Sequence, residues 1–161
     1  MYHQASLYSL NIQDPRYSTN HYMSAEEYFN LYKKCVDIQS IQFTLEDFKR
    51  FKQSPNIKLV TEKNCLAILG LTDSEVEIYF IGVSGSFRGK GLGKKLLKKI
   101  ISFCEDHKAD SIMLEVAANN MPAKKMYLSF NFEKLGIRKN YYKNKSGLRQ
   151  DAILMKLNLK T

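Results

Sequence analysis

The alternation of hydrophobic and polar positions predicts two helices in the first third of the chain. Apolar residues recur at helical spacing between Tyr28 and Val36. Ser24 and Glu27 stand just before this run, three residues apart, as the two members of a capping box do. A second, shorter run of helical spacing begins at Thr44 and stops before the next proline.

The rest of the chain alternates between the spacing of strands and that of helices. Runs rich in β-branched and aromatic residues predict strands at residues 57–60, 66–71, 75–83, 111–116, 132–137 and 152–159. Leu96, Ile100 and their apolar neighbours predict one face of a helix that ends near His107, and Pro122 opens a short helix that reaches Ser129. Because helices and strands do not alternate strictly, this order predicts a mixed α/β fold.

Length and composition place the chain among soluble globular proteins. Its 161 residues, 44% apolar and 25% charged, predict a single domain that covers residues 1–161. The longest apolar run, residues 65–71, is far shorter than the roughly 20 residues that cross a bilayer. Residues 1–6 lack the basic and apolar stretches of a secretory signal, so we expect a cytoplasmic protein.

Cysteines and histidines are too scattered to predict a disulfide framework or a metal site. The three cysteines are Cys35, Cys65 and Cys104, an odd number without a CxxC pair. The three histidines, His3, His21 and His107, are equally far apart. We therefore expect reduced, buried thiols and no bound metal.

The net charge of +9 admits two interpretations: nucleic-acid binding, or a positive field around an anionic ligand. Lysines gather around one glycine-rich turn, at positions Lys94, Lys95, Lys98, Lys99, Lys124 and Lys125. The turn itself, residues 87–95, contains Arg88 and Lys90 and joins a predicted strand to a predicted helix. Glycines at the start of a helix expose backbone N–H groups, so the turn predicts a phosphate-bearing ligand.

Two phosphate-binding motifs do not fit this turn. A nucleotide P-loop has four residues between its glycines and a hydroxyl after its lysine, whereas Gly89 and Gly93 are separated by three residues and Lys95 takes the hydroxyl position. A dinucleotide fingerprint needs G-x-G-x-x-G, and Gly89, Gly91 and Gly93 are spaced differently. What remains is R-x-x-G-x-G, formed by Arg88, Gly91 and Gly93.

This pattern resembles the pyrophosphate loop of GNAT acetyltransferases, which hold acetyl-CoA. The strand around Glu115, then Asn120 and Tyr127, follow in the order and spacing of that family. The similarity spans residues 75–159 and is strongest to the RimI branch, whose members acetylate the N-terminal alanine of a small-subunit ribosomal protein. It implies a mixed α/β GNAT fold, with a mostly antiparallel sheet of about 6–7 strands and flanking helices.

The RimI resemblance also has departures. The best matches are residues 114–116, the spacing of Ala123 and Tyr127, residues 137–142 and residues 151–157. Ala117 stands where RimI-like chains carry arginine. The loss of this charge near the expected site bears on the identity of the acceptor more than on the acetyltransferase activity. Asn131 replaces a glycine, and asparagine tolerates a left-handed backbone better than most residues. The first 70 residues match much less well.

The resemblance implies roles for individual residues. Glu115, or else Glu77, would accept the proton of the amine, and Tyr127 would protonate the departing thiolate. Tyr141 and Tyr142 would border the acceptor. The residues implied to bind acetyl-CoA are Ile81, Val83, Arg88, Gly89, Lys90, Gly91, Leu92, Gly93, Lys94, Asn120 and Lys124. From the residues alone, Asn120 is equally an ordinary N-cap before Pro122.

The leading hypothesis is therefore acetyl transfer from acetyl-CoA to a protein N-terminal amine, with a ribosomal protein as the implied partner. One alternative is a small acceptor such as a polyamine, an amino sugar or a drug. Another is a basic RNA- or ribosome-binding module, based on the charge and on the tyrosines among basic residues at 138–145. Charge alone predicts only nonspecific binding, so we expect neither a direct nucleic-acid contact nor a membrane partner.

Overall fold

The computed structural model describes residues 23–36, 42–143, 147 and 149–160. Its helices are α1 (Ala25–Cys35), α2 (Leu45–Gln53), the 3₁₀ turn η2 (Gly85–Phe87), α3 (Leu92–Asp106) and α4 (Met121–Leu128). Its strands are β1 (Ile57–Glu62), β2 (Cys65–Leu71), β3 (Glu75–Val83), β4 (Ser111–Ala117), β5 (Glu133–Lys143) and β6 (Arg149–Asn158). Residues 1–6, His3 and His21, on which expectations were based, lie outside the described residues.

Both N-terminal helices begin with a complete capping box. The Ser24 hydroxyl accepts the Glu27 N–H at 3.2 Å, and the Glu27 carboxylate accepts the Ser24 N–H at 2.6 Å. Thr44 and Asp47 repeat this exchange at the start of α2, at 3.2 and 2.8 Å. The caps satisfy backbone donors that a helix leaves unpaired, and they confirm the two predicted helix starts.

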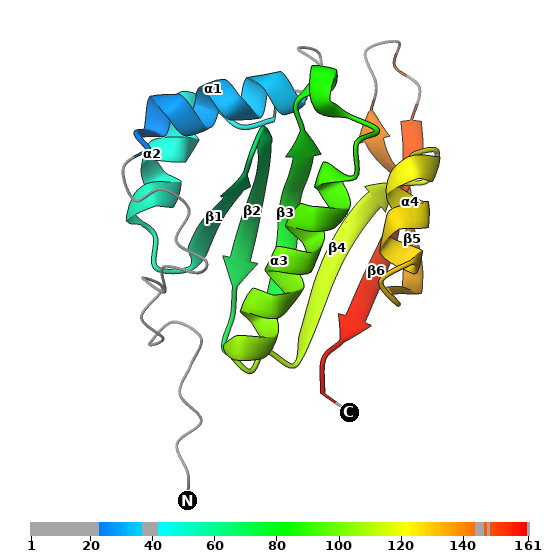
Figure 1. Cartoon of the computed structure of the whole chain (residues 1–161). Coiled ribbons are helices and arrows are strands. Elements are labelled where there is room, and N and C mark those ends of the chain that lie inside the picture. The colour runs from blue at the N-terminus through cyan, green and yellow to red at the C-terminus, as the bar shows by residue number, and fades with distance from the viewer. Residues whose placement is uncertain (1–22, 37–41, 144–146, 148, 161) are drawn as a thin grey trace, which may run out of the picture.

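The six strands form one sheet in the order β1-β2-β3-β4-β6-β5. Neighbouring strands are antiparallel except for β3 and β4, which are parallel. The ladder between β3 and β4 ends at Ile78 and Leu114, although β3 continues to Val83 and β4 to Ala117. The two strands diverge beyond that point (Figure 1). This mixed, mostly antiparallel sheet is the predicted fold class.

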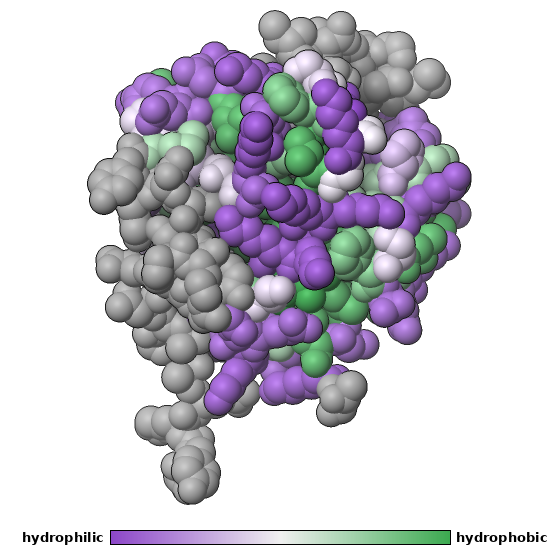
Figure 2. Space-filling model, viewed as in Figure 1, coloured by the Kyte–Doolittle hydropathy of each residue, from purple (hydrophilic) through white to green (hydrophobic). Residues whose placement is uncertain are grey.

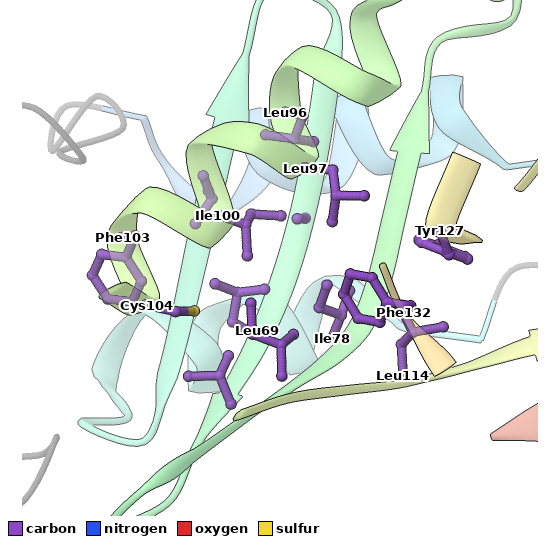
Figure 3. Packing of buried hydrophobic residues seen from close by; sticks show 14 of the residues in the cluster. Leu69, Ile78, Leu96, Leu97, Ile100, Phe103, Cys104, Leu114, Tyr127 and Phe132 are labelled. Atoms are coloured by element: carbon purple, nitrogen blue, oxygen red, sulfur yellow. The ribbon is translucent and has the colours of Figure 1, made fainter. Parts of the chain in front are cut away.

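Alternate residues of β2 face two different hydrophobic layers. Cys65, Ala67 and Leu69 belong to the cluster that contains the inner face of α3 and Tyr127 of α4 (Figure 3). Leu66 and Ile68 instead belong to the cluster formed with α1 and α2. Helices therefore cover both faces of the sheet, and α1 and α2 pack mainly against β1, β2 and β3. The three cysteines are buried free thiols, as predicted.

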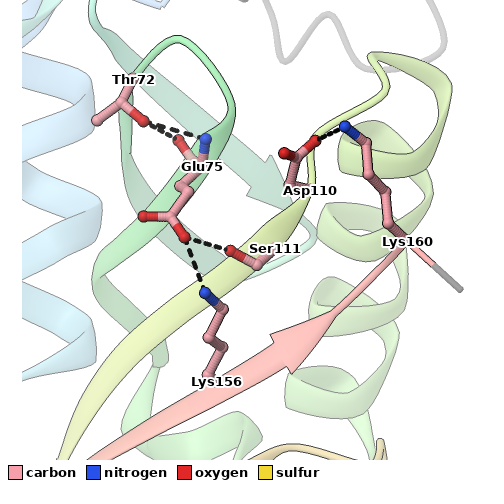
Figure 4. A network of polar contacts seen from close by, with 6 residues as sticks. All are labelled: Thr72, Glu75, Asp110, Ser111, Lys156 and Lys160. Carbon is pink, nitrogen blue, oxygen red and sulfur yellow. Dashed lines mark hydrogen bonds and ion pairs between the residues drawn. The ribbon is translucent and has the colours of Figure 1, made fainter.

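A polar network joins β3 and β4 at the end where the two strands are paired, around Glu75 and Ser111 (Figure 4). The Glu75 carboxylate accepts from the Ser111 hydroxyl at 2.8 Å and from the Lys156 ammonium at 2.9 Å. These hydrogen bonds, the Lys156 bond first, lower the pKa of Glu75. They join β3, β4 and β6, and Asp110 forms a further ion pair with Lys160 beside them.

The C-terminal strands are longer than predicted. The expected strand at 132–137 is β5, which extends to Lys143, and the expected strand at 152–159 is β6, which begins three residues earlier, at Arg149. The register of β5 shifts between Arg138 and Tyr142, and Asn140 has φ +56°. This irregularity breaks the strand periodicity and hides the continuation from pattern analysis. Asn131 has φ +62°, the left-handed backbone expected of it.

Within the described ranges, no helix is both long enough and apolar enough to cross a membrane.

Candidate active site

The glycine turn leads from η2 into α3 with a left-handed backbone. Gly89 has φ +74°, and Gly91, the N-cap of α3, has φ +77°. Gly91 has no side chain to cap the helix, and the first turn of α3 contains no acidic residue. The N–H groups of Leu92, Gly93 and Lys94 therefore remain available to an anion, and the helix dipole favours one there.

Space above the turn is open. Apart from the glycine itself and its neighbours in the chain, no described residue has a heavy atom within 4 Å of the position that a Cβ would take at Gly89 or Gly91. A side chain would therefore fit at either position. Glycine is favoured there because the left-handed backbone conformation disfavours residues that have a Cβ. At Gly93 a Cβ would lie 3.6 Å from Val83 and 3.4 Å from Met126, which are ordinary van der Waals distances, so α3 packs beside β3 and α4 at this point.

The basic side chains of the turn have different contacts. Arg88 points back into the protein, where its Nε donates to the Val83 carbonyl at 3.2 Å and its Nη2 to the Cys35 carbonyl at 2.8 Å. The Lys90 ammonium lies 5.2 Å from the centre of the Phe87 ring. Lys94 is exposed on α3, whose outward side is covered by hydrophilic residues (Figure 2). Arg88 thus shapes the turn, whereas Lys90 and Lys94 are free to approach a phosphate.

An open strand edge lies beside the turn. Beyond Ile78, β3 has no ladder with β4. Ile81 and Val83 are in this segment, half-buried, and both pack against the cluster under α3. The edge can therefore pair with an extended ligand as a neighbouring strand would.

Two polar side chains at the start of α4 bond to nearby backbone groups. Asn120 is the N-cap of α4, and its Oδ1 accepts the Ala123 N–H at 3.2 Å. The Lys124 ammonium donates to the Ala118 carbonyl at 2.9 Å. The interpretation of Asn120 as an N-cap is therefore confirmed, and the cofactor contacts of Asn120 and Lys124 stay predictions.

Two carboxylates face one another across β3 and β4. Glu115 is bound by Arg138, whose Nη1 lies 2.9 Å from the Glu115 Oε1, and its side chain is 15% exposed. Glu77, on β3, has a raised pKa because partial burial disfavours its charge and the Glu115 carboxylate repels it, while Arg138 acts in the opposite direction. A raised pKa brings a carboxylate nearer to the range of a useful general base.

Three tyrosines are connected to this acidic pair through Tyr142, which interacts with Glu115. Tyr127 is 4% exposed, and its ring packs against Phe132 with centroids 5.6 Å apart. Burial, and then the proximity of Tyr142, raise the pKa of Tyr127, so its hydroxyl stays protonated. Burial and the Glu115 carboxylate also raise the pKa of half-buried Tyr142. Tyr141 is exposed and meets Tyr142 edge to face, with centroids 5.2 Å apart.

The structure thus brings together Glu77, Glu115, Tyr127 and Tyr142, which affect one another electrostatically. Sequence reasoning missed Arg138 as part of this group. Its position was known only as one residue of a matching segment, and its partner depends on the registers of three strands. Among the described residues, no group of three or more His, Cys, Asp and Glu side chains could hold a metal ion.

The sequence is similar to those of known acetyltransferases. Residues 23–132 match the family model described as Acetyltransferase (GNAT) family. The ribosomal protein bS18-alanine N-acetyltransferase of Haemophilus ducreyi is 33% identical over 106 residues, which are 65% of this chain and 73% of that protein. The protein of the same name from Escherichia coli K12 is 33% identical over 112 residues, 70% of this chain and 72% of that protein.

Solved structures share the fold. The crystal structure of the ribosomal-protein-S18-alanine N-acetyltransferase from Escherichia coli aligns with a TM-score of 0.74 at 24% identity and covers 86% of this chain and 92% of that one. Arabidopsis thaliana NAA60 in complex with acetyl-CoA aligns with a TM-score of 0.69 at 16% identity, over 84% and 93% of the two chains. At these identities the likeness concerns the fold alone.

Proposed function

The chain belongs to the GNAT acetyltransferase family, and we propose that it moves the acetyl group of acetyl-CoA to the N-terminal alanine of a ribosomal protein. It is an acetyl-CoA-dependent N-acetyltransferase. The observation that carries the proposed site is the divergence of β3 from β4 beyond Ile78 and Leu114, next to the uncapped start of α3. A strand edge and a helix N-terminus suit the amides and the diphosphate of one ligand.

The residues present fit acetyl-CoA. The N–H groups after Gly91 would bind the diphosphate, with Lys90 and Lys94 nearby, and backbone groups around Ile81 and Val83 would pair with the pantetheine arm. The open space above Gly89 and Gly91 and the absence of acidic residues in the first turn of α3 support this assignment. The cosubstrate supplies the activated thioester.

The acid and base groups lie on the neighbouring strands. Glu115 or Glu77 would accept the proton of the ammonium, directly or through water, and leave the amine nucleophilic. Raised pKa values suit both Glu77, as a base, and Tyr127, which would hold its proton until the thiolate departs. Tyr141 and Tyr142 would border the acceptor at the end of β5.

The choice of acceptor rests on the relatives. Chains 33% identical to this one are named for the N-terminal alanine of ribosomal protein bS18. A polyamine or another small amine would also be attracted by Glu77 and Glu115, so it is the second candidate. The RNA-binding alternative loses part of its basis, because Arg138 is paired with Glu115.

Release of free thiol from acetyl-CoA tests the proposal, with alanine-starting peptides and polyamines compared as acceptors. We expect turnover with the peptide, and a decrease of about 100-fold or more in Glu115→Gln if Glu115 is the base. Turnover of polyamines alone would exclude the ribosomal acceptor. Failure to bind acetyl-CoA at millimolar concentration would exclude the proposed site.

A further inference from the structure

Arg138 reaches Glu115 across the strand that separates them. Glu115 lies opposite Leu154 of β6, and Arg138 lies opposite Ala152 of the same strand. Residues 152 and 154 point to the same face of the sheet, so the two charged side chains meet on that face. The short side chain of Ala152 leaves room for the guanidinium to cross β6, and its Nη1 contacts the Glu115 carboxylate at 2.9 Å.

The same guanidinium contacts the acceptor side. Its central carbon lies 5.2 Å from the centre of the Tyr141 ring, at the distance of a cation–π contact. The Tyr141 ring in turn packs edge to face with Tyr142. Arg138 therefore links the carboxylate of β4 to the aromatic pair of β5.

The positive charge of Arg138 matters because this side chain faces two carboxylates. The groups that face Glu115 are Arg138 and Tyr142 from β5 and Glu77 from β3. Arg138 is the only cation among these described groups. Without it, two carboxylates would face each other uncompensated, one of them mostly buried, and such pairs resist simultaneous ionisation.

We propose that Arg138 is a positioning residue for acetyl transfer: it orients the Glu115 carboxylate, compensates the negative charge of the acidic pair and fixes the Tyr141–Tyr142 pair beside it. This inference rests on the proposed function. Arg138 acts through Glu115 and has no assigned contact with the reacting atoms.

The pH dependence of kcat/KM with an alanine-starting peptide tests this role. In Arg138→Gln we expect the acidic limb to move to higher pH by roughly half a unit to one unit, since solvent screens part of the charge. We expect kcat/KM at neutral pH to fall about tenfold, because the carboxylate loses its orientation. Arg138→Lys should restore the limb but only part of the rate, because an ammonium lacks the planar fork.

Lys139→Gln is the matched control, since it removes the same charge one position along β5. Lys139 is exposed and makes no ion pair with a described residue. An equal shift in Lys139→Gln would overturn the inference, as would an unchanged limb in a folded Arg138→Gln protein. Absence of turnover by the unmodified protein with every amine would instead refute the proposed function, and the inference with it.

A double-mutant cycle separates positioning from simple stabilisation. If Arg138 acts through Glu115, Arg138→Gln should change kcat/KM by less than about twofold when Glu115→Gln is already present. Full additivity of the two effects would contradict the proposal. This readout also holds when Arg138→Gln alone folds poorly, because the double variant leaves no unpaired carboxylate at position 115.

Discussion

The Nη2 of Arg88 lies 2.8 Å from the carbonyl oxygen of Cys35, the last residue of α1. The Nε of the same guanidinium donates to Val83 at the end of β3. One side chain thus joins the glycine turn, the open strand and a helix on the other face of the sheet. Arg88 therefore couples the glycine turn to α1 as well as to β3.

Replacement of Arg88 should weaken this coupling. We expect Arg88→Lys to lower the free energy of unfolding by about 1 kcal/mol, because an ammonium cannot reach both carbonyls with the geometry of the planar fork. Acetyl-CoA affinity should fall as well, since the turn is less fixed. Urea denaturation and titration calorimetry measure the two effects. Lys90→Gln is the control for stability, because the contact that the Lys90 ammonium makes within the described part of the chain is with the aromatic ring of Phe87.

Gly91→Ala should strain the start of α3. At φ +77° a Cβ costs about 1–2 kcal/mol whatever room surrounds it, so we expect lower stability and weaker binding of acetyl-CoA. Gly85→Ala provides the comparison, because Gly85 also has open space but no positive φ. Equal effects of the two substitutions on the unfolding midpoint would show that the left-handed backbone is not the cause.

Tyr127→Phe should lower the rate of acetyl transfer without changing the stability of the fold. Among the described residues the Tyr127 hydroxyl has no hydrogen-bond partner, so the packing on Phe132 survives and stability should hardly change. We expect kcat to fall about 100-fold as the proton donor is lost, with little change in acetyl-CoA affinity. Tyr32→Phe should do the reverse, because its buried hydroxyl accepts the Gln42 N–H at 2.9 Å. Normal turnover by Tyr127→Phe would remove Tyr127 from the mechanism.

Glu77→Gln should stabilise the protein at neutral pH while it lowers turnover. The raised pKa of Glu77 means that the folded state holds its proton more tightly than the unfolded state. Ionised Glu77 therefore opposes folding at pH 7, and the substitution removes that cost. The gain should vanish below the ordinary carboxyl pKa of 4.5, where Glu77 is protonated in both states. Thermal unfolding of both proteins across this pH range checks the sign.

The helices could be predicted from local sequence signals, whereas the contacts between residues distant in the sequence could not be predicted. Ser24 and Thr44 mark helix starts because a cap is formed by residues only three positions apart. The glycine turn was likewise readable from its spacing. The partners of Arg88 and Arg138 were not, since Cys35 is 53 positions away and the Arg138 contact depends on a shifted register in β5. A shift of one residue would send a side chain to the other face of the sheet.

The diverging end of β3 has a consequence for the enzyme between turnovers. A bare strand edge is a template on which a second chain can add, and proteins guard such edges against aggregation. Here the register shift opposite Ile68 and Leu69 distorts the same stretch of β3, which makes it a poor template for a regular strand. The distortion that would admit an irregular ligand would thus also discourage pairing with a second copy of the chain when acetyl-CoA is absent.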